Sequence, residues 1–365
     1  MSDITIKDIA RECGVGVSTV SRAINNHPDI NPETRKKILS VIQETGFIPN
    51  NSARYLKRSE SNNIALLVKG ITNPFFTDMI RIIEEGVEKR GYTATLRHVG
   101  PAEDEVSIAQ GLVKERRLKG IIFLGGNFTH EKSALEQIGV PFVFATIGED
   151  PKEAEELSRE RSDQKLTYAN IAIDDVQAAY DAVEYLIGLG HTKIALVTEG
   201  LGIPSVGQLR FLGYRKAMAD HALSYTEDQI YVVQEGIEHF SLSNGYAAAR
   251  ALLGHRPDLT AIFCISDVLA LGACRAIADL GRSVPEDVSV IGFDGIEMGD
   301  YVNPRITTMR QPFEEISQES ISILFGMIDQ KSDPRDIIMN AQLKVRESTA
   351  ACTRNETNAL QGKAG

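Results

Sequence analysis

The chain has few cysteines, and their placement excludes two common kinds of site. Four occur in 365 residues, namely Cys13, Cys264, Cys274 and Cys352, and none belongs to a C-x-x-C pair. Closely paired cysteines are typical of structural zinc sites and of disulfide-rich secreted domains. The sequence therefore predicts reduced thiols, with neither a disulfide framework nor a metal site.

Long hydrophobic runs are also missing. No uncharged stretch reaches the roughly 18 residues that suggest a membrane-spanning helix. The first 25 residues lack the apolar core of a signal peptide, because charged residues interrupt them: Asp3, Lys7, Asp8, Arg11 and Glu12. We expect a soluble, cytoplasmic protein that does not enter a membrane.

Motifs of common enzymes are absent or incomplete. Residues 202–207 have the glycine spacing of a phosphate-binding loop, but Gln208 stands where such a loop has lysine. His130 and Glu131 are not followed by the second histidine of a zinc-protease helix, and no G-x-S-x-G elbow occurs. The sequence therefore predicts a binding protein rather than an enzyme, with no cofactor.

The charge is unevenly distributed along the chain. The net charge of −11 argues, as an average, against a nucleic-acid-binding protein. However, residues 1–60 carry nine Lys and Arg against seven Asp and Glu, whereas the other 305 residues carry 30 against 43. The weakly basic amino-terminal segment is therefore the part suited to contact phosphates.

The first 45 residues have the pattern of short helices. Thr5 and Asp8 have capping-box spacing, and apolar residues then recur at helical spacing up to Cys13. Gly14 begins a three-residue interruption, and a second helix is predicted over residues 17–24. Two short helices joined by a glycine-containing turn are typical of a helix-turn-helix unit.

A third helix is expected to start after Asn31 and to end before Gly46. The second helix leaves a polar set on its outer side: Ser18, Thr19, Ser21, Arg22, Asn25 and Asn26. Such side chains reach phosphates and base edges in a major groove. A small helical bundle without a ligand is the alternative interpretation of this pattern.

Residues 4–26 and 46–56 resemble the amino-terminal signature of the lactose repressor (LacI/GalR) family. The resemblance implies a homodimer that binds a near-palindromic operator in double-stranded DNA, with Val17, Ser18 and Arg22 reading bases. It implies this set of DNA-binding residues: Thr5, Val17, Ser18, Thr19, Ser21, Arg22, Asn25, Asn50, Ala53 and Leu56. Gly16 departs from the family, which usually has a capping serine there.

Residues 47–62 follow this headpiece of residues 1–46. Taken alone, they favour a flexible tether, because residues 53–56 could form only about one helical turn. The resemblance implies instead a hinge helix that forms on DNA and inserts Leu56 into a minor-groove step. Such apolar wedges kink DNA at a cost of a few kcal/mol, which added contacts offset.

From residue 63 onward, short apolar runs alternate with amphipathic helical stretches. The runs form two sets, at residues 64–68, 92–99, 120–124 and 143–145, and then near 171 and at 194–197, 230–233, 261–264 and 288–291. Strands that alternate with helices predict doubly wound parallel α/β sheets. Two such sets predict two lobes with a cleft between them.

The family's core resembles periplasmic sugar-binding proteins, and five motifs here match it, at residues 73–76, 210–214, 266–272, 292–295 and 304–312. The resemblance implies an N-lobe of residues 63–172 plus 304–335 and a C-lobe of residues 173–303 plus 336–351, followed by a polar tail of residues 352–365.

Most of these motifs follow predicted strand ends, where open α/β sheets bind ligands. Asp294 could accept paired hydroxyls, Arg210 offers a forked donor, and aromatic rings could stack on a sugar. The resemblance implies a small-molecule effector, a sugar or related metabolite, bound by Asn73, Phe75, Phe76, Ile173, Arg210, Phe240, Ser266 and Asp294. Helix packing, capping and surface charge are the structural alternatives for each.

Two segments fit the family less well. Residues 149–165 hold seven acidic and four basic side chains, which favours a solvated insertion. The tail lacks the leucine heptads of a tetramerising coiled coil, so we expect a dimer.

The whole pattern predicts a transcriptional regulator, a repressor, controlled by a small metabolite. Two alternatives remain: a sugar receptor without DNA activity, and a catabolite-control regulator that answers to a phosphocarrier protein, whose family branch residues 120–129 resemble.

Overall fold

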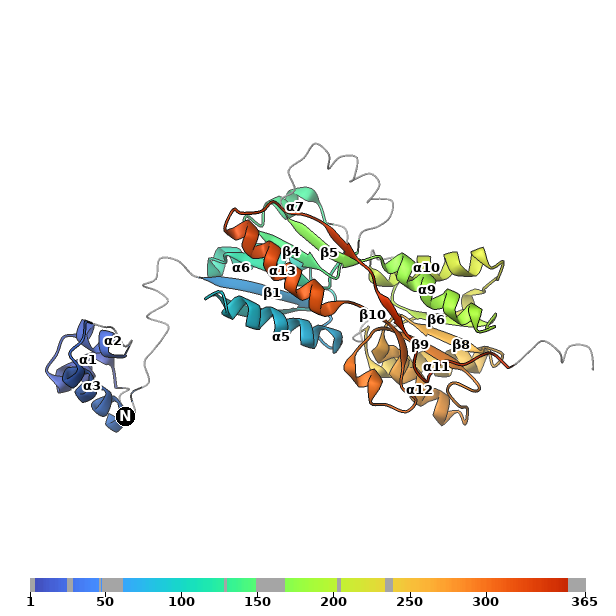
Figure 1. The fold of residues 1–365 in the computed structure, drawn as a ribbon, viewed down its shortest axis with the longest axis horizontal. Helices are drawn as coiled ribbons and strands as arrows, with labels where there is room; N and C mark the ends of the chain where they lie inside the picture. Colours follow the sequence, from blue (N-terminus) through green and yellow to red (C-terminus); the bar gives the residue numbers. More distant parts are fainter. Residues whose placement is uncertain are drawn as a thin grey trace, which may run out of the picture. The chain divides into compact units, whose positions relative to one another are not determined.

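The computed structural model describes residues 4–24, 29–45, 47, 62–127, 130–148, 168–201, 205–233 and 239–353. The chain divides into two compact units, Met1–Ser61 and Asn62–Gly365 (Figure 1). Several sequence predictions lie outside the described residues: those for Asn25, Asn26, Asn50, Ala53, Leu56, the charged segment 149–165 and most of the tail.

The first unit contains the three predicted helices, α1 (Ile6–Cys13), α2 (Val17–Ile24) and α3 (Pro32–Thr45). Gly14 ends α1 with a φ of 68°, in the left-handed region that glycine adopts without a steric cost. The helices close on a small buried core of Ile9, Ala10, Cys13, Val20, Ala23 and Ile38. The helix-turn-helix prediction is therefore confirmed.

The second unit begins with a six-stranded sheet in the order β11-β5-β4-β3-β1-β2, with every pairing parallel. Its strands are β1 (Asn63–Lys69), β2 (Thr93–Val99), β3 (Gly120–Leu124), β4 (Phe142–Ala145), β5 (Ala169–Ile173) and β11 (Ile337–Met339). Its helices are α5 (Phe75–Glu88), α6 (Glu105–Arg116), α7 (Lys132–Glu136) and α13 (Phe313–Ile328). We call this sheet with its helices the first lobe.

Both faces of this sheet are covered. Leu66 of β1 packs in one apolar cluster with α5 and α13, whereas Leu67 packs in another with α6 and α7. A parallel strand buried on both faces needs apolar side chains at consecutive positions, which explains the uninterrupted run at 64–68.

The second lobe repeats this plan with the strand order β12-β10-β9-β8-β6-β7. Its strands are β6 (Ile194–Thr198), β7 (Ile230–Val232), β8 (Ala261–Cys264), β9 (Ser289–Asp294), β10 (Thr307–Arg310) and β12 (Gln342–Lys344). Its helices are α9 (Asp175–Gly188), α10 (Val206–Asp220), α11 (Leu242–His255) and α12 (Asp267–Asp279), with 3-10 turns at Glu227–Gln229 and Glu297–Asp300.

Figure 1 shows α9 and α10 on one face of the second sheet and α11 and α12 on the other. All pairings in this sheet are parallel except that of the edge strand β12, which is antiparallel to β10. A helical headpiece followed along the chain by two doubly wound sheets is the predicted fold class, and it is confirmed.

The chain passes between the lobes after β5, after β10 and after β11. Two short strands do not belong to the lobe that the sequence predicted for them. Strand β10 belongs to the second sheet, although residues 304–335 were predicted for the N-lobe, and β11 belongs to the first sheet, although residues 336–351 were predicted for the C-lobe. Strands of three or four residues at a crossing carry no pattern that identifies their sheet, so the sequence could not place them.

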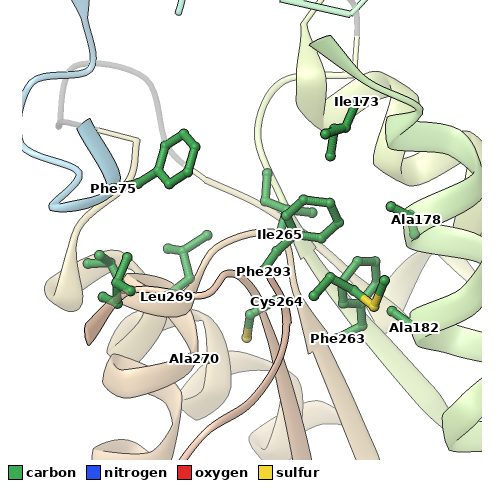
Figure 2. Close-up of a cluster of buried hydrophobic side chains, with 14 of the residues drawn as sticks. Phe75, Ile173, Ala178, Ala182, Phe263, Cys264, Ile265, Leu269, Ala270 and Phe293 are labelled. Carbon is green, nitrogen blue, oxygen red and sulfur yellow. The ribbon is translucent and has the colours of Figure 1, made fainter. Parts of the chain in front are cut away.

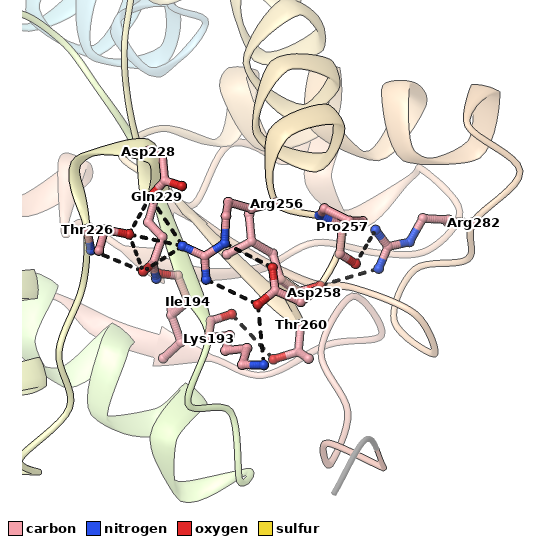
Figure 3. Close-up of polar contacts among 11 residues, drawn as sticks. Lys193, Ile194, Thr226, Asp228, Gln229, Arg256, Pro257, Asp258, Thr260 and Arg282 are labelled. Atoms are coloured by element: carbon pink, nitrogen blue, oxygen red, sulfur yellow. Dashed lines mark hydrogen bonds and ion pairs between the residues drawn. The ribbon is translucent and has the colours of Figure 1, made fainter. Parts of the chain in front are cut away.

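A polar network ties loops together at the amino-terminal edge of the second sheet (Figure 3). Arg256 donates hydrogen bonds to Asp258, Thr226 and Gln229, and Lys193 pairs with Asp258 at 3.3 Å. Because these side chains pair with one another, we interpret the network as one that stabilises the fold at this edge of the sheet. In the described part of the chain, no helix is long and apolar enough to cross a membrane.

Candidate functional site

One face of α2 is left uncovered by the headpiece core. Val20 and Ala23 are buried, whereas Val17, Ser18, Ser21 and Arg22 are exposed, and Val17 keeps 41% of its surface accessible. An exposed valine beside hydroxyl and guanidinium groups suits contact with base edges in a major groove, where a thymine methyl is an apolar partner. Thr19 is half-buried, so it lies at the border of this face.

The position of α2 is fixed by the other two helices. The Asp8 carboxylate accepts hydrogen bonds from the backbone N–H and the hydroxyl of the exposed Thr5, which forms the predicted capping box of α1. From α3, Arg35 donates to the carbonyl of Ala23 and Lys37 donates to that of Cys13. The headpiece therefore presents α2 on a rigid support.

The second unit contains a cleft lined by residues at or beyond the carboxyl ends of strands in both lobes. The space that it encloses is about 990 Å³, including the part open to solvent. The first lobe contributes Lys69, Gly70, Asn73, Phe75, Phe76, Pro101, Gly125, Gly126, Asn127 and Thr146. The second contributes Glu199, Gly200, Ser205, Val206, Arg210, His239, Phe240, Asp294 and Gln311.

This location follows from the strand order. In each sheet the order reverses beside the first strand, between β1 and β3 and between β6 and β8. Loops leave such a switch point in opposite directions and open a crevice at the carboxyl edge of the sheet. The two crevices face one shared cleft, so both lobes contribute residues to its lining.

Asp294 occupies the floor of this cleft at the end of β9. Its carboxylate accepts hydrogen bonds from Asn73 Nδ2 at 2.9 Å and from Gln311 Nε2 at 2.8 Å. The backbone of Asp294 has a φ of 107°, a conformation that costs a residue with a side chain about 1–3 kcal/mol. Such a conformation persists only where surrounding contacts fix the residue, and it is common at functional sites. Here the residue held in this way is one whose carboxylate lines the cleft.

Arg210 lies beside Asp294 but is bound by other groups. Its Nε donates to Asp175 at 2.8 Å and its Nη1 donates to the carbonyl of Ile265, while the distance from Nη1 to the Asp294 carboxylate is 3.7 Å. The guanidinium carbon lies 3.6 Å from the centroid of the Phe293 ring. Arg210 is therefore held as a fixed plane in the floor rather than as a mobile surface charge.

The floor carries more buried carboxylates than cations. Burial raises the pKa of Asp175 to about 6, with Arg210 opposing the rise, and burial also raises the pKa of Asp294. Asp267, at the start of α12, has its pKa raised to about 8 by burial and by the charge of Asp294. Its carboxyl accepts the amides of Gly295 and Ile296 at 2.8 Å, so it fixes the loop that follows Asp294.

Aromatic rings line the cleft from both lobes. Phe75 and Phe76 begin α5 with ring centroids 5.3 Å apart, and Phe240 precedes α11. Figure 2 shows Phe75 of the first lobe in one cluster with Ile265 and Phe293, which lie near the carboxyl ends of strands in the second lobe. These rings supply apolar faces of the kind that pack on a sugar ring.

Six of the eight predicted effector residues line the cleft, namely Asn73, Phe75, Phe76, Arg210, Phe240 and Asp294. The structure does not bring Ile173 and Ser266 to this lining. The Ser266 hydroxyl is fully buried and accepts the amide of Leu269 as the cap of α12. Ile173 is 3% exposed and belongs to the apolar cluster between the lobes.

Sequence reasoning missed several polar lining residues: Lys69, Asn127, Thr146, Glu199, Ser205, His239 and Gln311. Lys69 and Gln311 directly end or follow strands, so strand-end position was a usable signal for them. Glu199 also directly follows a strand, β6, whereas the loop of His239 gives no such signal. Only the fold brings these two side chains together in the cleft wall.

A polar brace supports the loop after β3. The Glu105 carboxylate accepts hydrogen bonds from Lys69 Nζ at 3.0 Å and from the amide of Asn127 at 2.7 Å, and it lies 3.2 Å from His130 Nε2. Burial raises the pKa of Glu105, but these donors outweigh it and lower the pKa to about 2. Gly126, at a φ of 142°, leaves room for this carboxylate, because a Cβ there would lie 2.5 Å from Oε1.

Asp104, Glu105 and His130 lie close enough together to suggest a metal site. However, Asp104 flanks Nδ1 of the histidine and Glu105 flanks Nε2, on opposite sides of the ring. Glu105 is already bound by Lys69 and Asn127. We therefore interpret the cluster as a set of polar contacts that holds the loop after β3 in the cleft wall.

Glu199 forms a second polar group in the cleft wall. Its carboxylate accepts the amide of Gly207, in the first turn of α10, at 3.0 Å and lies 3.3 Å from His239 Nδ1. Burial raises the pKa of Glu199, but His239, Ser205 and the Gly207 amide together lower it below its ordinary value. Glu199 is therefore a charged group in the wall of the cleft.

Comparisons with known proteins find similarity to both parts of the chain. Residues 5–50 match the bacterial regulatory proteins of the lacI family, and residues 183–349 match a periplasmic binding protein-like domain. HTH-type transcriptional regulator MalR of Clostridium butyricum is 39% identical over 352 residues, which cover 94% of this chain and 99% of the relative. Catabolite control protein A of Priestia megaterium is 30% identical and covers 95% of this chain and 99% of the relative.

A solved structure, a transcriptional regulator CelR-cellobiose complex, is similar over 94% of this chain and 99% of that chain. It has a TM-score of 0.64 and 27% sequence identity.

Proposed function

Because this chain belongs to the LacI family of bacterial regulatory proteins, it is a DNA-binding transcriptional regulator and not an enzyme, and we propose that a saccharide in its cleft controls operator binding. The headpiece is the DNA-binding part, and the two-lobed unit is the sensor.

The observation that carries the proposal is the chemistry of the cleft. A strained, buried carboxylate at Asp294 provides strong acceptors for paired hydroxyls, and Asn73 and Gln311 beside it provide amide groups. Phe75, Phe76 and Phe240 provide apolar ring faces. A polyhydroxylated ring, which is polar at its rim and apolar on its faces, matches this combination.

The position of these groups supports control of DNA binding. Asn73 belongs to the first lobe and Asp294 to the second, so a ligand that binds the floor contacts both lobes at once. The first lobe begins directly after the segment that joins the headpiece to the core. A change in lobe closure can therefore alter headpiece placement, and such coupling is typically about 1–3 kcal/mol.

The operator would be read by a homodimer. We propose that Val17, Ser18, Ser21 and Arg22 of each headpiece face the major groove of one half-site, because they are the exposed face of α2. Thr5 and Thr19 would contact the backbone. Asn25, Asn50, Ala53 and Leu56 remain part of this proposal from the family resemblance.

A thermal-shift screen of sugars, sugar phosphates and nucleosides on the full chain tests the proposal. A ligand at about 100 times its dissociation constant stabilises the bound state by about 2.7 kcal/mol, which raises the melting temperature. Each hit is then added to the protein on an operator selected from random DNA. A hit that shifts both melting temperature and operator affinity supports the proposal.

Asp294→Asn is the matched test of location, with the exposed Asp333→Asn as control. Loss of the thermal shift in Asp294→Asn alone, with operator binding retained, supports a site on the cleft floor. A shift that survives in Asp294→Asn places the ligand elsewhere, and a screen without any sugar hit contradicts the proposal.

A second candidate function is control by a phosphocarrier protein. The similarity to Catabolite control protein A favours it, as does the resemblance of residues 120–129 to that branch. That segment includes β3 and three residues that line the cleft, Gly125, Gly126 and Asn127. Part of the resemblance therefore lies in cleft residues and does not by itself indicate a protein partner. Operator affinity measured with and without a purified phosphorylated carrier protein tests this candidate.

A further inference from the structure

Among the described residues that line the cleft, Lys69 and Arg210 are the lysine and arginine side chains, and both are already bound by carboxylates. Lys69 Nζ donates to Glu105 and to the carbonyl of Glu103, each at 3.0 Å. Arg210 is paired with Asp175 at 2.8 Å. The side chains of Lys69 and Arg210 keep only 15% and 4% of their surface exposed. An anionic ligand would have to break one of these buried ion pairs to gain a lysine or arginine partner.

A helix amino terminus also faces the cleft, and it too is occupied. Helix α10 starts at Val206, and Ser205 and Val206 line the cleft. The amide of Gly207 in the first turn donates to Glu199 at 3.0 Å, and a Cβ on Gly207 would lie 2.3 Å from Glu199 Cγ. Helix amino termini attract phosphates, but here a carboxylate of the chain itself takes that position.

Two carboxyl groups lie near this position. Glu199 holds its charge because His239 and the Gly207 amide stabilise the carboxylate. Asp294 contributes a second carboxylate, on the floor of the same cleft. Both groups are acceptors, which favours hydroxyl donors and repels an anion.

From this arrangement we infer that the effector is an uncharged saccharide and that Glu199 is the residue that rejects phosphorylated sugars. The inference rests on the proposed saccharide function of the cleft and specifies its ligand class. Glu199 acts as an internal anion: it fills the helix terminus that a sugar phosphate would otherwise use. Like charges brought together at a binding site cost several kcal/mol, so a phosphorylated sugar binds at least about 10-fold more weakly than its neutral parent.

The test uses matched pairs of neutral and phosphorylated sugars. Glucose, ribose, maltose, trehalose, sucrose and cellobiose are each compared with their phosphate esters on the full chain. Thermal shift finds the sugar that binds, and titration calorimetry gives the dissociation constants of the pair. We expect a neutral sugar to bind and its ester to bind at least about 10-fold more weakly.

Two variants examine the role of Glu199. Glu199→Gln removes the charge and keeps the shape, and Glu199→Ala empties the helix terminus. In both, the ratio of the two dissociation constants should fall by about 10-fold toward parity, because the phosphate no longer meets a resident carboxylate. Glu286→Gln is the matched control, since Glu286 is exposed and precedes β9 at the opposite edge of the same sheet.

The outcomes separate this inference from the proposed function. A phosphate ester that binds the unaltered chain as tightly as its parent overturns the inference and leaves the saccharide function standing. If Glu199→Gln weakens both ligands equally and keeps their ratio, Glu199 only caps α10 and the inference is wrong. If neither member of any pair binds, the saccharide function fails and the inference fails with it.

Discussion

Asn73 Nδ2 lies 2.9 Å from Asp294 Oδ2, and this hydrogen bond joins the two lobes across the cleft. Both side chains are almost fully buried, and Asn73 also accepts the amide of Phe75, which orients its amide group. The bond occupies an acceptor that a ligand hydroxyl would use. A ligand that reaches this oxygen of Asp294 must therefore replace or share a contact between the two lobes.

Asn73→Asp should destabilise the chain in a pH-dependent manner. The substitution keeps the shape and the contact to Phe75, but it places a second carboxylate against Asp294. At pH 8 we expect the free energy of unfolding to fall by about 1–3 kcal/mol, and at pH 5.5 by less, because a shared proton restores a hydrogen bond. Thermal unfolding at both pH values measures this. Asn73→Ala removes the donor to Asp294 and the acceptor for Phe75 but adds no charge, so it should lack the pH dependence. Equal pH dependence in the two variants would contradict the assignment.

Asp267→Asn should change how stability depends on pH between 6 and 8. Burial and the charge of Asp294 raise the pKa of Asp267 to about 8, whereas an unfolded aspartate has lost its proton above about pH 4. The folded chain therefore binds more protons than the unfolded chain in this window, so Asp267 lowers stability as pH rises.

Asparagine cannot titrate. Between pH 6 and pH 8, the free energy of unfolding should therefore fall by roughly 1–2 kcal/mol less in the variant than in the parent. Denaturant unfolding of both proteins at pH 6, 7 and 8 measures the difference. Parallel curves for variant and parent would mean that Asp267 is ionised throughout.

Arg22→Ala should remove operator selectivity more than it removes DNA binding. Arg22 is exposed on α2 beside Val17 and Ser18, and a bidentate contact from arginine to guanine typically contributes about 1–3 kcal/mol of discrimination. Competition between the selected operator and scrambled DNA measures selectivity at fixed salt. Arg11→Ala, an exposed arginine on α1, is the control. Retained selectivity in Arg22→Ala would exclude Arg22 as a base reader.

Gly16→Ser should stabilise the headpiece slightly. Gly16 precedes α2 at the capping position, and a Cβ there would meet only Ser18 Oγ at 3.6 Å and Thr19 Oγ1 at 3.9 Å. A serine therefore fits and can accept an amide of the first turn, for a gain of a few tenths of a kcal/mol. The melting temperature and the operator affinity should both rise slightly, as measured by thermal unfolding and by operator titration. Gly14→Ser is the contrasting variant, since its φ of 68° penalises any side chain.

The local elements were predictable because they depend on near neighbours in the chain. The capping box of Thr5 and Asp8, the left-handed Gly14 and the apolar spacing up to Cys13 identify the first helix and its end. Buried parallel strands need consecutive apolar residues, which made β1 and β3 readable. Arg210 and Asp294, which were singled out by their motif positions, both line the cleft, and their role in effector binding stays a prediction.

The sequence by itself determined the headpiece, the alternation of strands and helices, and the residue types of the floor. Only the tertiary structure decided the sheet of β10 and β11, the capping role of Ser266 and the entry of Glu199 and His239 into the cleft wall. Local structure follows spacing along the chain, but these features depend on which distant segments meet. A carboxylate such as Glu199 acquires its role from the helix terminus and histidine brought beside it, and no pattern in its own loop encodes those neighbours.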